Sequence, residues 1–164
     1  MKTLNFILCG FMILFLSACS SDNVEVKNGD FEELEVKNTL CKDKVSGRWL
    51  PDVEESYLTY KVDGKKLKVE IINYIADCGT EKVTVEAIDA GNNQIEVKLT
   101  QVSELSANCV CPMDVAFSLP NLKEGETYKC DVKSKSVSGK YYFPLVSFTF
   151  EMDKGVNGKV LLEE

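Results

Sequence analysis

The chain has 164 residues, with 26 acidic and 19 basic side chains and a formal charge of −7. It contains seven cysteines and no histidine, which excludes Ser-His-Asp and Cys-His catalysis, histidine-ligated metals and a histidine pH switch. Arg48 is the single arginine, and an acidic chain with dispersed lysines repels the phosphate backbone, so we expect no nucleic-acid partner.

Residues 1–18 predict an export signal. A short positive start, Met1-Lys2-Thr3, precedes a mostly apolar run that is shorter than the about 20 residues of a membrane span. Leu16-Ser17-Ala18-Cys19 then resembles the bacterial lipobox, in which the cysteine is acylated and becomes the first mature residue. The resemblance implies a lipid on Cys19 that holds the protein to the outer membrane, facing the periplasm or the cell surface. The alternative is a plain signal peptide with an incidental cysteine.

The rest of the chain predicts one domain behind a tether. Residues 19–30 are mostly polar and indicate a solvated, lipid-anchored tether. Residues 31–164 have the length of a single folded domain.

From about Glu35 onward, apolar and polar residues alternate with a period of two, which predicts β-strands. Asp63-Gly64 and Gly91-Asn92-Asn93 supply the positive φ angles of tight turns, and Pro144 indicates an edge strand or a bulge. The sequence shows no helical apolar stripe and no glycine-rich phosphate loop. The expected inward rows are Leu58, Tyr60 and Val62; Leu67, Val69 and Ile71; Val83, Val85 and Ala87; Ile95, Val97 and Leu99; Val115, Phe117 and Leu119; Tyr128, Cys130 and Val132; and Val146, Phe148, Phe150 and Met152.

Seven to nine short strands of this kind predict an all-β fold. We expect an antiparallel, immunoglobulin-like (Greek-key) β-sandwich. A lipocalin-like barrel is the alternative, because Gly47-Arg48-Trp49 matches the G-x-W that opens such barrels.

The segment from Leu122 to Cys130 resembles the tyrosine corner of immunoglobulin-like domains. In that motif a tyrosine opens a strand and its hydroxyl bonds to backbone a few residues upstream. Here Leu122 would fill the core, Gly125 would permit the turn and Tyr128 would be the corner tyrosine. An ordinary glycine turn before a strand is the alternative.

A second motif is Cys109-Val110-Cys111-Pro112-Met113-Asp114, with Phe117 three residues on and Cys78 upstream. Together with the Leu122, Gly125 and Tyr128 pattern, it resembles small uncharacterised Bacteroidales (Bacteroidetes) lipoproteins with a C-x-C-P-x-D strand motif. The resemblance covers about half of the mature chain. It implies an immunoglobulin-like sandwich and an envelope address, and it brings no catalytic residues.

Cysteine counting leaves five structural candidates. Cys9 leaves with the signal and Cys19 takes the lipid, while an exported domain meets an oxidising compartment in which disulfides form. We expect Cys78 to pair with Cys109 or Cys111. Cys41 and Cys130 are candidates for a second bridge, or Cys130 is a free buried thiol because it lies in an inward row.

Metal and redox roles for these cysteines are less favoured. The C-x-C spacing of Cys109 and Cys111 differs from the C-x₂₋₄-C of zinc sites and from the C-x-x-C of catalytic dithiols. Asp114 falls on the outward phase of its strand, where a solvated carboxylate is expected. We therefore expect no metal site and no cofactor.

The acidic residues of the loops predict solvated charge rather than a catalytic pair. These residues are Asp52, Glu54, Glu55, Glu124 and Glu126. The leading hypothesis is a non-enzymatic envelope lipoprotein that binds a protein or a glycan. One alternative is a lipocalin-like carrier of a small apolar ligand, with Phe117, Phe148 and Phe150 lining a cavity. A thiol-dependent redox enzyme using Cys109 and Cys111 is the other.

Overall fold

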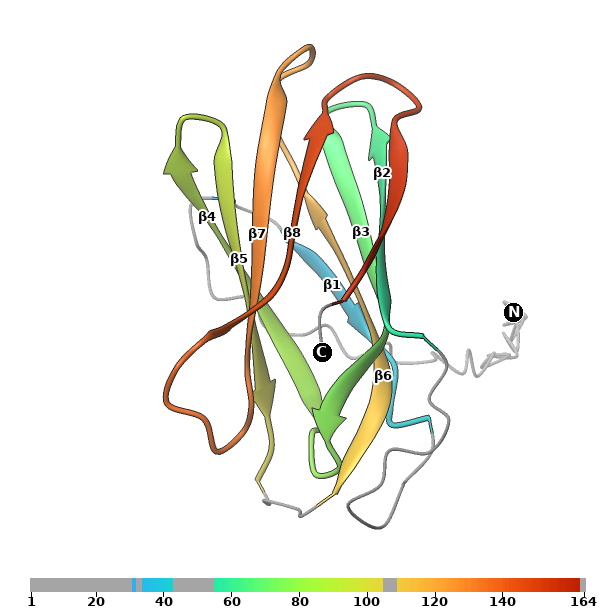
Figure 1. Ribbon diagram of the computed structural model, residues 1–164, viewed down its shortest axis with the longest axis vertical. Helices are drawn as coiled ribbons and strands as arrows, with labels where there is room; N and C mark the ends of the chain where they lie inside the picture. The colour runs from blue at the N-terminus through green and yellow to red at the C-terminus, as the bar shows by residue number, and fades with distance from the viewer. Residues whose placement is uncertain (1–30, 32–33, 43–54, 105–108, 163–164) are drawn as a thin grey trace, which may run out of the picture.

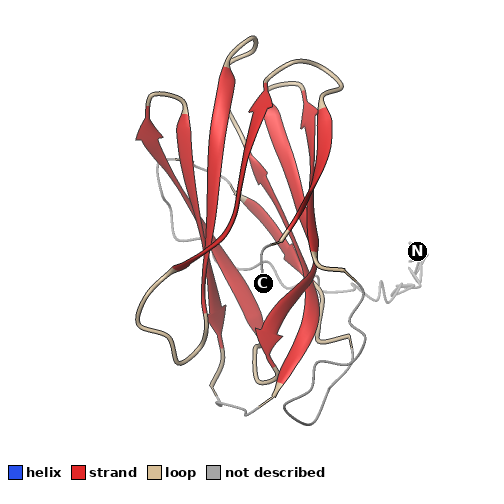
Figure 2. Cartoon of the chain, viewed as in Figure 1, coloured by secondary structure: helices blue, strands red, loops and turns tan. Residues whose placement is uncertain are grey.

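The computed structural model describes residues 31, 34–42, 55–104 and 109–162, which form nine strands and no helix (Figures 1 and 2). The segments predicted to be an export signal and a tether, together with Cys19 and Gly47-Arg48-Trp49, lie outside the described residues. The strands are β1 (Glu35–Asn38), β2 (Tyr57–Asp63), β3 (Lys66–Asp77), β4 (Lys82–Gly91), β5 (Gln94–Val102), β6 (Val110–Leu119), β7 (Thr127–Lys135), β8 (Phe143–Glu151) and β9 (Asn157–Leu161).

The strands divide into two sheets that pack face to face as a β-sandwich (Figure 1). Sheet A has the order β1-β6-β3-β2-β9, and sheet B has the order β4-β5-β7-β8. Both sheets end in edge strands, so the described strands do not close into a barrel. The sandwich prediction is confirmed, and the barrel alternative is wrong for this part of the chain.

The core forms where the alternating pattern places it. All the predicted inward residues are buried except Tyr60, which is partly buried against the core. Removing apolar surface from water is the main favourable term in folding, and a strand with one buried face fixes its register by this pattern. Register is therefore specified mainly by the inward rows.

Two predicted hairpins are present, and local backbone preferences explain both. Gly64 has a φ of +59° in the two-residue turn between β2 and β3. Asn92 and Asn93 have φ angles of 53° and 57° in the turn between β4 and β5. Positive φ at both central positions is the type I′ geometry, which asparagine tolerates better than most residues.

One pairing differs from the antiparallel expectation. β5 and β7 run parallel, with Gln94 opposite Lys129 and Thr100 opposite Lys135. The reason is that β6 crosses into sheet A and returns the chain to the end of the sandwich at which β5 began. β6 then lies beside β3, which gives the Greek-key connection spread over two sheets.

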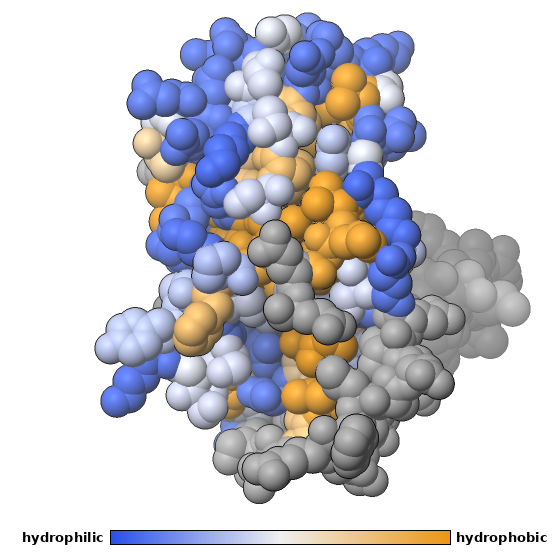
Figure 3. Space-filling view, in the orientation of Figure 1, coloured by the Kyte–Doolittle hydropathy of each residue, from blue (hydrophilic) through white to orange (hydrophobic). Residues whose placement is uncertain are grey.

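An aromatic cluster closes one side of the sandwich, between β2 and β9 of sheet A and β7 and β8 of sheet B. The Tyr60 ring stacks on Phe148 at 4.8 Å between centroids, and Tyr128 stacks on Phe150 at 5.7 Å. Figure 3 shows apolar residues gathered along the seam between β8 and β9, with hydrophilic residues on both sides. Phe117, Phe148 and Phe150, proposed as cavity-lining residues, are buried in the core between the sheets.

Gly158 of β9 leaves room for this cluster. It pairs with Tyr60 of β2, and a Cβ atom on Gly158 would come within 2.5 Å of the Tyr60 ring. We expect Gly158→Ala to lower the free energy of unfolding by about 1–3 kcal/mol, because the ring is held against Phe148 and cannot move away freely. Chemical denaturation would measure the change. Asn157→Ala on the exposed face of the same strand is the control, and an equal effect of both substitutions would contradict the explanation.

Candidate functional site

Two disulfides lie at one end of the sandwich, here called the disulfide end. Cys78 pairs with Cys109, with their Cα atoms 5.4 Å apart, and Cys41 pairs with Cys111, with their Cα atoms 5.6 Å apart. The first pair is one of the two pairings expected for Cys78. Of the two candidates for a second bridge, Cys41 does form one, with Cys111 as its partner, whereas Cys130 faces the core on β7 and is unpaired.

The two bridges hold β6 to two different neighbours. Cys78 follows β3 and Cys109 precedes β6, so this bridge extends the β3–β6 ladder beyond its last pair. Cys41 follows the short edge strand β1, and its bridge to Cys111 secures that strand to β6. The bridges span 31 and 70 residues, and each closure alone would contribute about 4 kcal/mol in the chain-entropy model.

Cys130 is the free thiol among the described cysteines, and it is fully buried on β7. Burial in apolar surroundings, with a smaller effect of Asp131, raises the pKa of the Cys130 thiol to about 12. The thiol is therefore protonated and unreactive near neutral pH, since the thiolate is the nucleophile. The alternative expectation of a free buried thiol is confirmed.

The tyrosine corner is present at the opposite end, here called the hairpin end. The Lys123 backbone N–H donates to the Tyr128 hydroxyl at 3.1 Å, and Leu122 is buried. Gly125 has a φ of +77°, a conformation that other residues adopt at a cost. The motif closes the connection between β6 of sheet A and β7 of sheet B.

A buried polar network joins the two sheets near the disulfides. The Tyr74 hydroxyl of β3 lies 2.5 Å from the Ser134 hydroxyl of β7 and accepts from the Gln101 side-chain amide of β5 at 3.0 Å. The Gln101 carbonyl oxygen in turn accepts from the Asp77 backbone N–H and the Thr80 hydroxyl. Burial raises the pKa of Tyr74, and its hydrogen bonds oppose that shift. Because buried polar atoms cost free energy unless paired, this network is structural.

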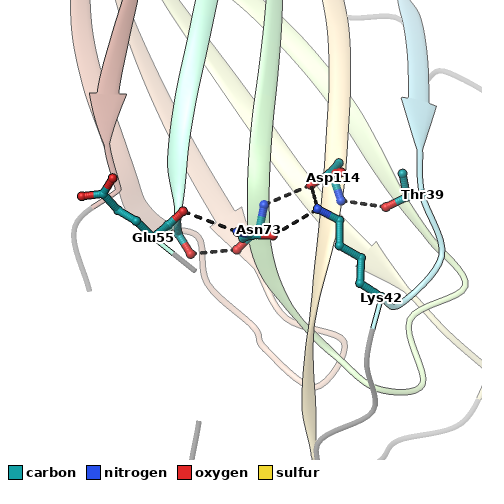
Figure 4. Close-up of polar contacts among 6 residues, drawn as sticks. Thr39, Lys42, Glu55, Asn73 and Asp114 are labelled. Carbon is teal, nitrogen blue, oxygen red and sulfur yellow. Dashed lines mark hydrogen bonds and ion pairs between the residues drawn. The ribbon is translucent and has the colours of Figure 1, made fainter. Parts of the chain in front are cut away.

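Asn73 lies at a bulge in β3, and a polar cluster surrounds it (Figure 4). Asn73 has a φ of 55° and is almost fully buried. Its backbone N–H donates to Asp114 Oδ1 at 3.1 Å, and its side-chain oxygen accepts from Lys42 Nζ at 3.1 Å. Ser56 donates to the Asn73 carbonyl at 2.8 Å, and Lys42 forms an ion pair with Asp114 at 2.6 Å.

Asp114 thus has a specific role that the sequence pattern did not reveal. It does face outward, as expected, but its carboxylate holds the bulge instead of lying free in solvent. The Asp114 backbone also pairs with Thr39, which continues the β1–β6 ladder. A bulge depends on the partner strand for its hydrogen bonds, and no spacing within β3 or β6 alone signals it.

Between Asp114 and the hairpin end, the outer face of sheet A forms a broad hollow of about 770 Å³. The strand register explains how it is built, because residues in register lie in rows across the five strands. One row runs from β1 to β9 through Lys37, Ala116, Glu70, Thr59 and Lys159. The next row runs through Glu35, Ser118, Lys68, Lys61 and Asn157.

The floor of this hollow is lowest along β6. Ala116 and Ser118 are small and half-buried there, while the long, exposed side chains of β1 and β3 stand on either side. Across β6, Lys37 of β1 is in register with Glu70 of β3, and Glu35 is in register with Lys68. We call this feature the β6 trough.

The charges on the two outer faces differ in how they are paired. On sheet B, Lys133 and Lys98 pair with Glu96, and Lys129 pairs with Asp131. A hydrogen bond from Lys133 is the largest cause of the lowered pKa of Glu96.

On sheet A, Lys68 pairs with Asp63 at 2.5 Å, and this contact is the main cause of the raised pKa of Lys68, with Glu35 adding to it. Lys37 and Lys61 form no ion pair among the described residues.

The loop carboxylates named from the sequence do not gather at one place. Asp52 and Glu54 lie outside the described residues. Glu55 pairs with Lys159 at 3.3 Å, and Glu126 accepts from the Asn93 side chain at the hairpin end. Glu124 is exposed. In the described ranges, no three Cys, Asp or Glu side chains are grouped so that they could hold a metal ion. No helix in the same ranges could span a membrane.

Comparison with known proteins gives no relative. No family model, no curated protein and no solved structure matches the chain.

The pairing of the cysteines can be tested by non-reducing peptide mapping of the protein as it is produced. We expect the linked peptides Cys41–Cys111 and Cys78–Cys109, with Cys130 unlinked. A maleimide should label Cys130 only after denaturation, even at pH 9, because the thiol is buried and its pKa is about 12. A Cys41–Cys130 peptide, or rapid labelling of the native protein, would contradict this arrangement.

The role of Asp114 can be tested by two substitutions at the same position. Asp114→Ala leaves the buried Asn73 N–H without its acceptor, which should lower the free energy of unfolding by about 1–3 kcal/mol. Asp114→Asn keeps an acceptor oxygen and loses only a partly exposed ion pair, so its cost should be below about 1 kcal/mol. Denaturant melts would compare the two, and equal costs would show that the hydrogen bond to the bulge is unimportant.

Proposed function

We propose that this protein is a lipid-anchored lipoprotein of the cell envelope that works by binding and has no enzymatic activity. The observation that carries the proposal is Leu16-Ser17-Ala18-Cys19 behind an apolar leader, a sequence that resembles the lipobox. Acylation of Cys19 would hold the chain at the membrane, since each buried CH₂ of a lipid contributes about 0.8 kcal/mol.

The disulfides support an extracytoplasmic address. Four of the five cysteines that follow Cys19 are paired with one another in two bridges. Disulfides of this kind persist in oxidising compartments, such as the bacterial periplasm and the cell surface. The address and the bridges are therefore consistent with each other.

The same bridges favour binding over thiol chemistry. Cys109 and Cys111 each bond to a different partner, so the C-x-C does not form a dithiol pair of its own. Cys130 is buried and its pKa is raised, which disfavours the reactive thiolate. The exposed hollow on sheet A instead offers side chains suited to contact a partner.

The anchor can be tested by metabolic labelling with palmitate. Wild-type protein should take up the label and partition with the envelope, whereas Cys19→Ala should remain unlabelled. Cys9→Ala is a matched control, because Cys9 lies in the same leader and is removed with it. Labelling of Cys19→Ala, or its loss in Cys9→Ala, would contradict the assignment of Cys19.

A further inference from the structure

We infer that the β6 trough and its rim on sheet A bind an acidic glycan, that is, an oligosaccharide or polysaccharide that carries carboxylate groups. This inference rests on the proposed binding role and names the class of partner. It is argued from the shape, the charge and the hydrogen-bonding groups of the outer face.

The shape suits a chain of sugar units. The hollow has about 770 Å³ and extends over all five strands of sheet A. Five strands at the usual spacing are about 19 Å across, which accommodates a short oligosaccharide. The floor is open because Thr59, Ala116 and Ser118 are small and no loop of the described residues lines it.

The charge favours an anionic partner. The hollow and the smaller one beside it are lined by six lysines and three carboxylates, although the whole chain has a formal charge of −7. The lysines are Lys37, Lys61, Lys65, Lys66, Lys68 and Lys159.

Four of these lysines form no ion pair within the described ranges, and an anionic ligand would therefore not have to displace an existing partner from them. A local positive surplus on an acidic protein also concentrates anionic ligands at that face.

The hydrogen-bonding groups favour a glycan over an acidic peptide. Thr59, Ser118 and Asn157 present hydroxyl and amide groups that both donate and accept, which suits sugar hydroxyls. Peptides that bind to sheets usually add as a strand to a free edge. Here β6, β3 and β2 already pair on both sides, so their backbone has no free row of groups.

The carboxylates within the trough argue against a dense polyanion. Glu35 and Glu70 alternate with Lys37 and Lys68 across β6, so positive and negative positions follow one another along the floor. A glycan offers carboxylates spaced between neutral hydroxyls. Its carboxylates can pair with the lysines, and its hydroxyls can donate hydrogen bonds to the glutamates.

The test is a binding titration with the mature protein purified as it is produced. An oligogalacturonate and an oligomer of alginate are the acidic probes, a maltooligosaccharide of equal length is the neutral probe, and polyglutamate is the acidic peptide probe. We expect an acidic glycan to bind at least about tenfold more tightly than either of the other two classes, and its affinity to fall with added salt.

Two kinds of variant locate the site. Lys37→Gln combined with Lys61→Gln should weaken binding by about fivefold or more, because two cations are lost from the rim. Ser118→Tyr should weaken it similarly by filling the floor without a change in charge.

Lys129→Gln combined with Lys133→Gln, and separately Thr149→Tyr, make the same changes on the outer face of sheet B and should bind as the wild type does. Thermal melting would verify that each variant is folded. If Ser118→Tyr does not fold, the lysine variant still tests the inference.

Absence of binding to both acidic glycans would overturn the inference. So would equal binding of the neutral sugar or of polyglutamate, or a wild-type affinity in both the Lys37/Lys61 and the Ser118 variants. None of these outcomes bears on palmitate labelling of Cys19, so failure of the glycan inference is distinguishable from failure of the anchor.

Discussion

The bulge at Asn73 determines which residues of β3 face the core between Asn73 and the disulfide end, and the contacts at that end depend on this choice. Before the bulge, Ile71 faces the core opposite Val115, and after it Tyr74 faces the core opposite Met113. Two residues of β3 therefore lie opposite one residue of β6, so β3 contains one extra residue. Because side chains alternate in a strand, one extra residue reverses which positions face inward. Tyr74 can therefore reach Gln101 and Ser134, and Cys78 can reach Cys109. Asp114 satisfies the backbone N–H of Asn73 at this site.

The two ends of the sandwich are held together by different means. At the hairpin end, tight turns and the tyrosine corner fix the connections locally, because each depends on residues close in sequence. At the disulfide end, the contacts join residues far apart in the chain. There, covalent bridges and a buried polar network hold together strands that no short turn connects. β6 belongs to both systems, since it starts at the two bridging cysteines and ends at the tyrosine corner. Its outward face is the floor of the trough, so the strand with the most anchors also carries the proposed binding surface.

Rigidity of this kind suits a binding role. A site on the face of a sheet keeps its spacing because the register of each strand is fixed by the buried rows beneath it. The outward positions are then free to vary in charge without a cost to the core. On sheet B, Lys98 and Lys133 pair with Glu96, and Lys129 pairs with Asp131. On sheet A, the hollow-lining residues that form no ion pair among the described residues include more lysines than carboxylates.

The sequence by itself determined the fold class, the inward rows and the two hairpins, because period-two alternation and turn residues are local signals. It also predicted the tyrosine corner from Leu122, Gly125 and Tyr128. It left Cys130 open between a second bridge and a free buried thiol, and the structure decided for the free thiol. Only the tertiary structure decided the Cys41–Cys111 pair, the parallel pairing of β5 with β7, the bulge at Asn73 and the trough on sheet A. Each of these depends on which strands become neighbours, and a Greek-key chain brings together residues such as Lys37 and Glu70 whose proximity no local pattern encodes.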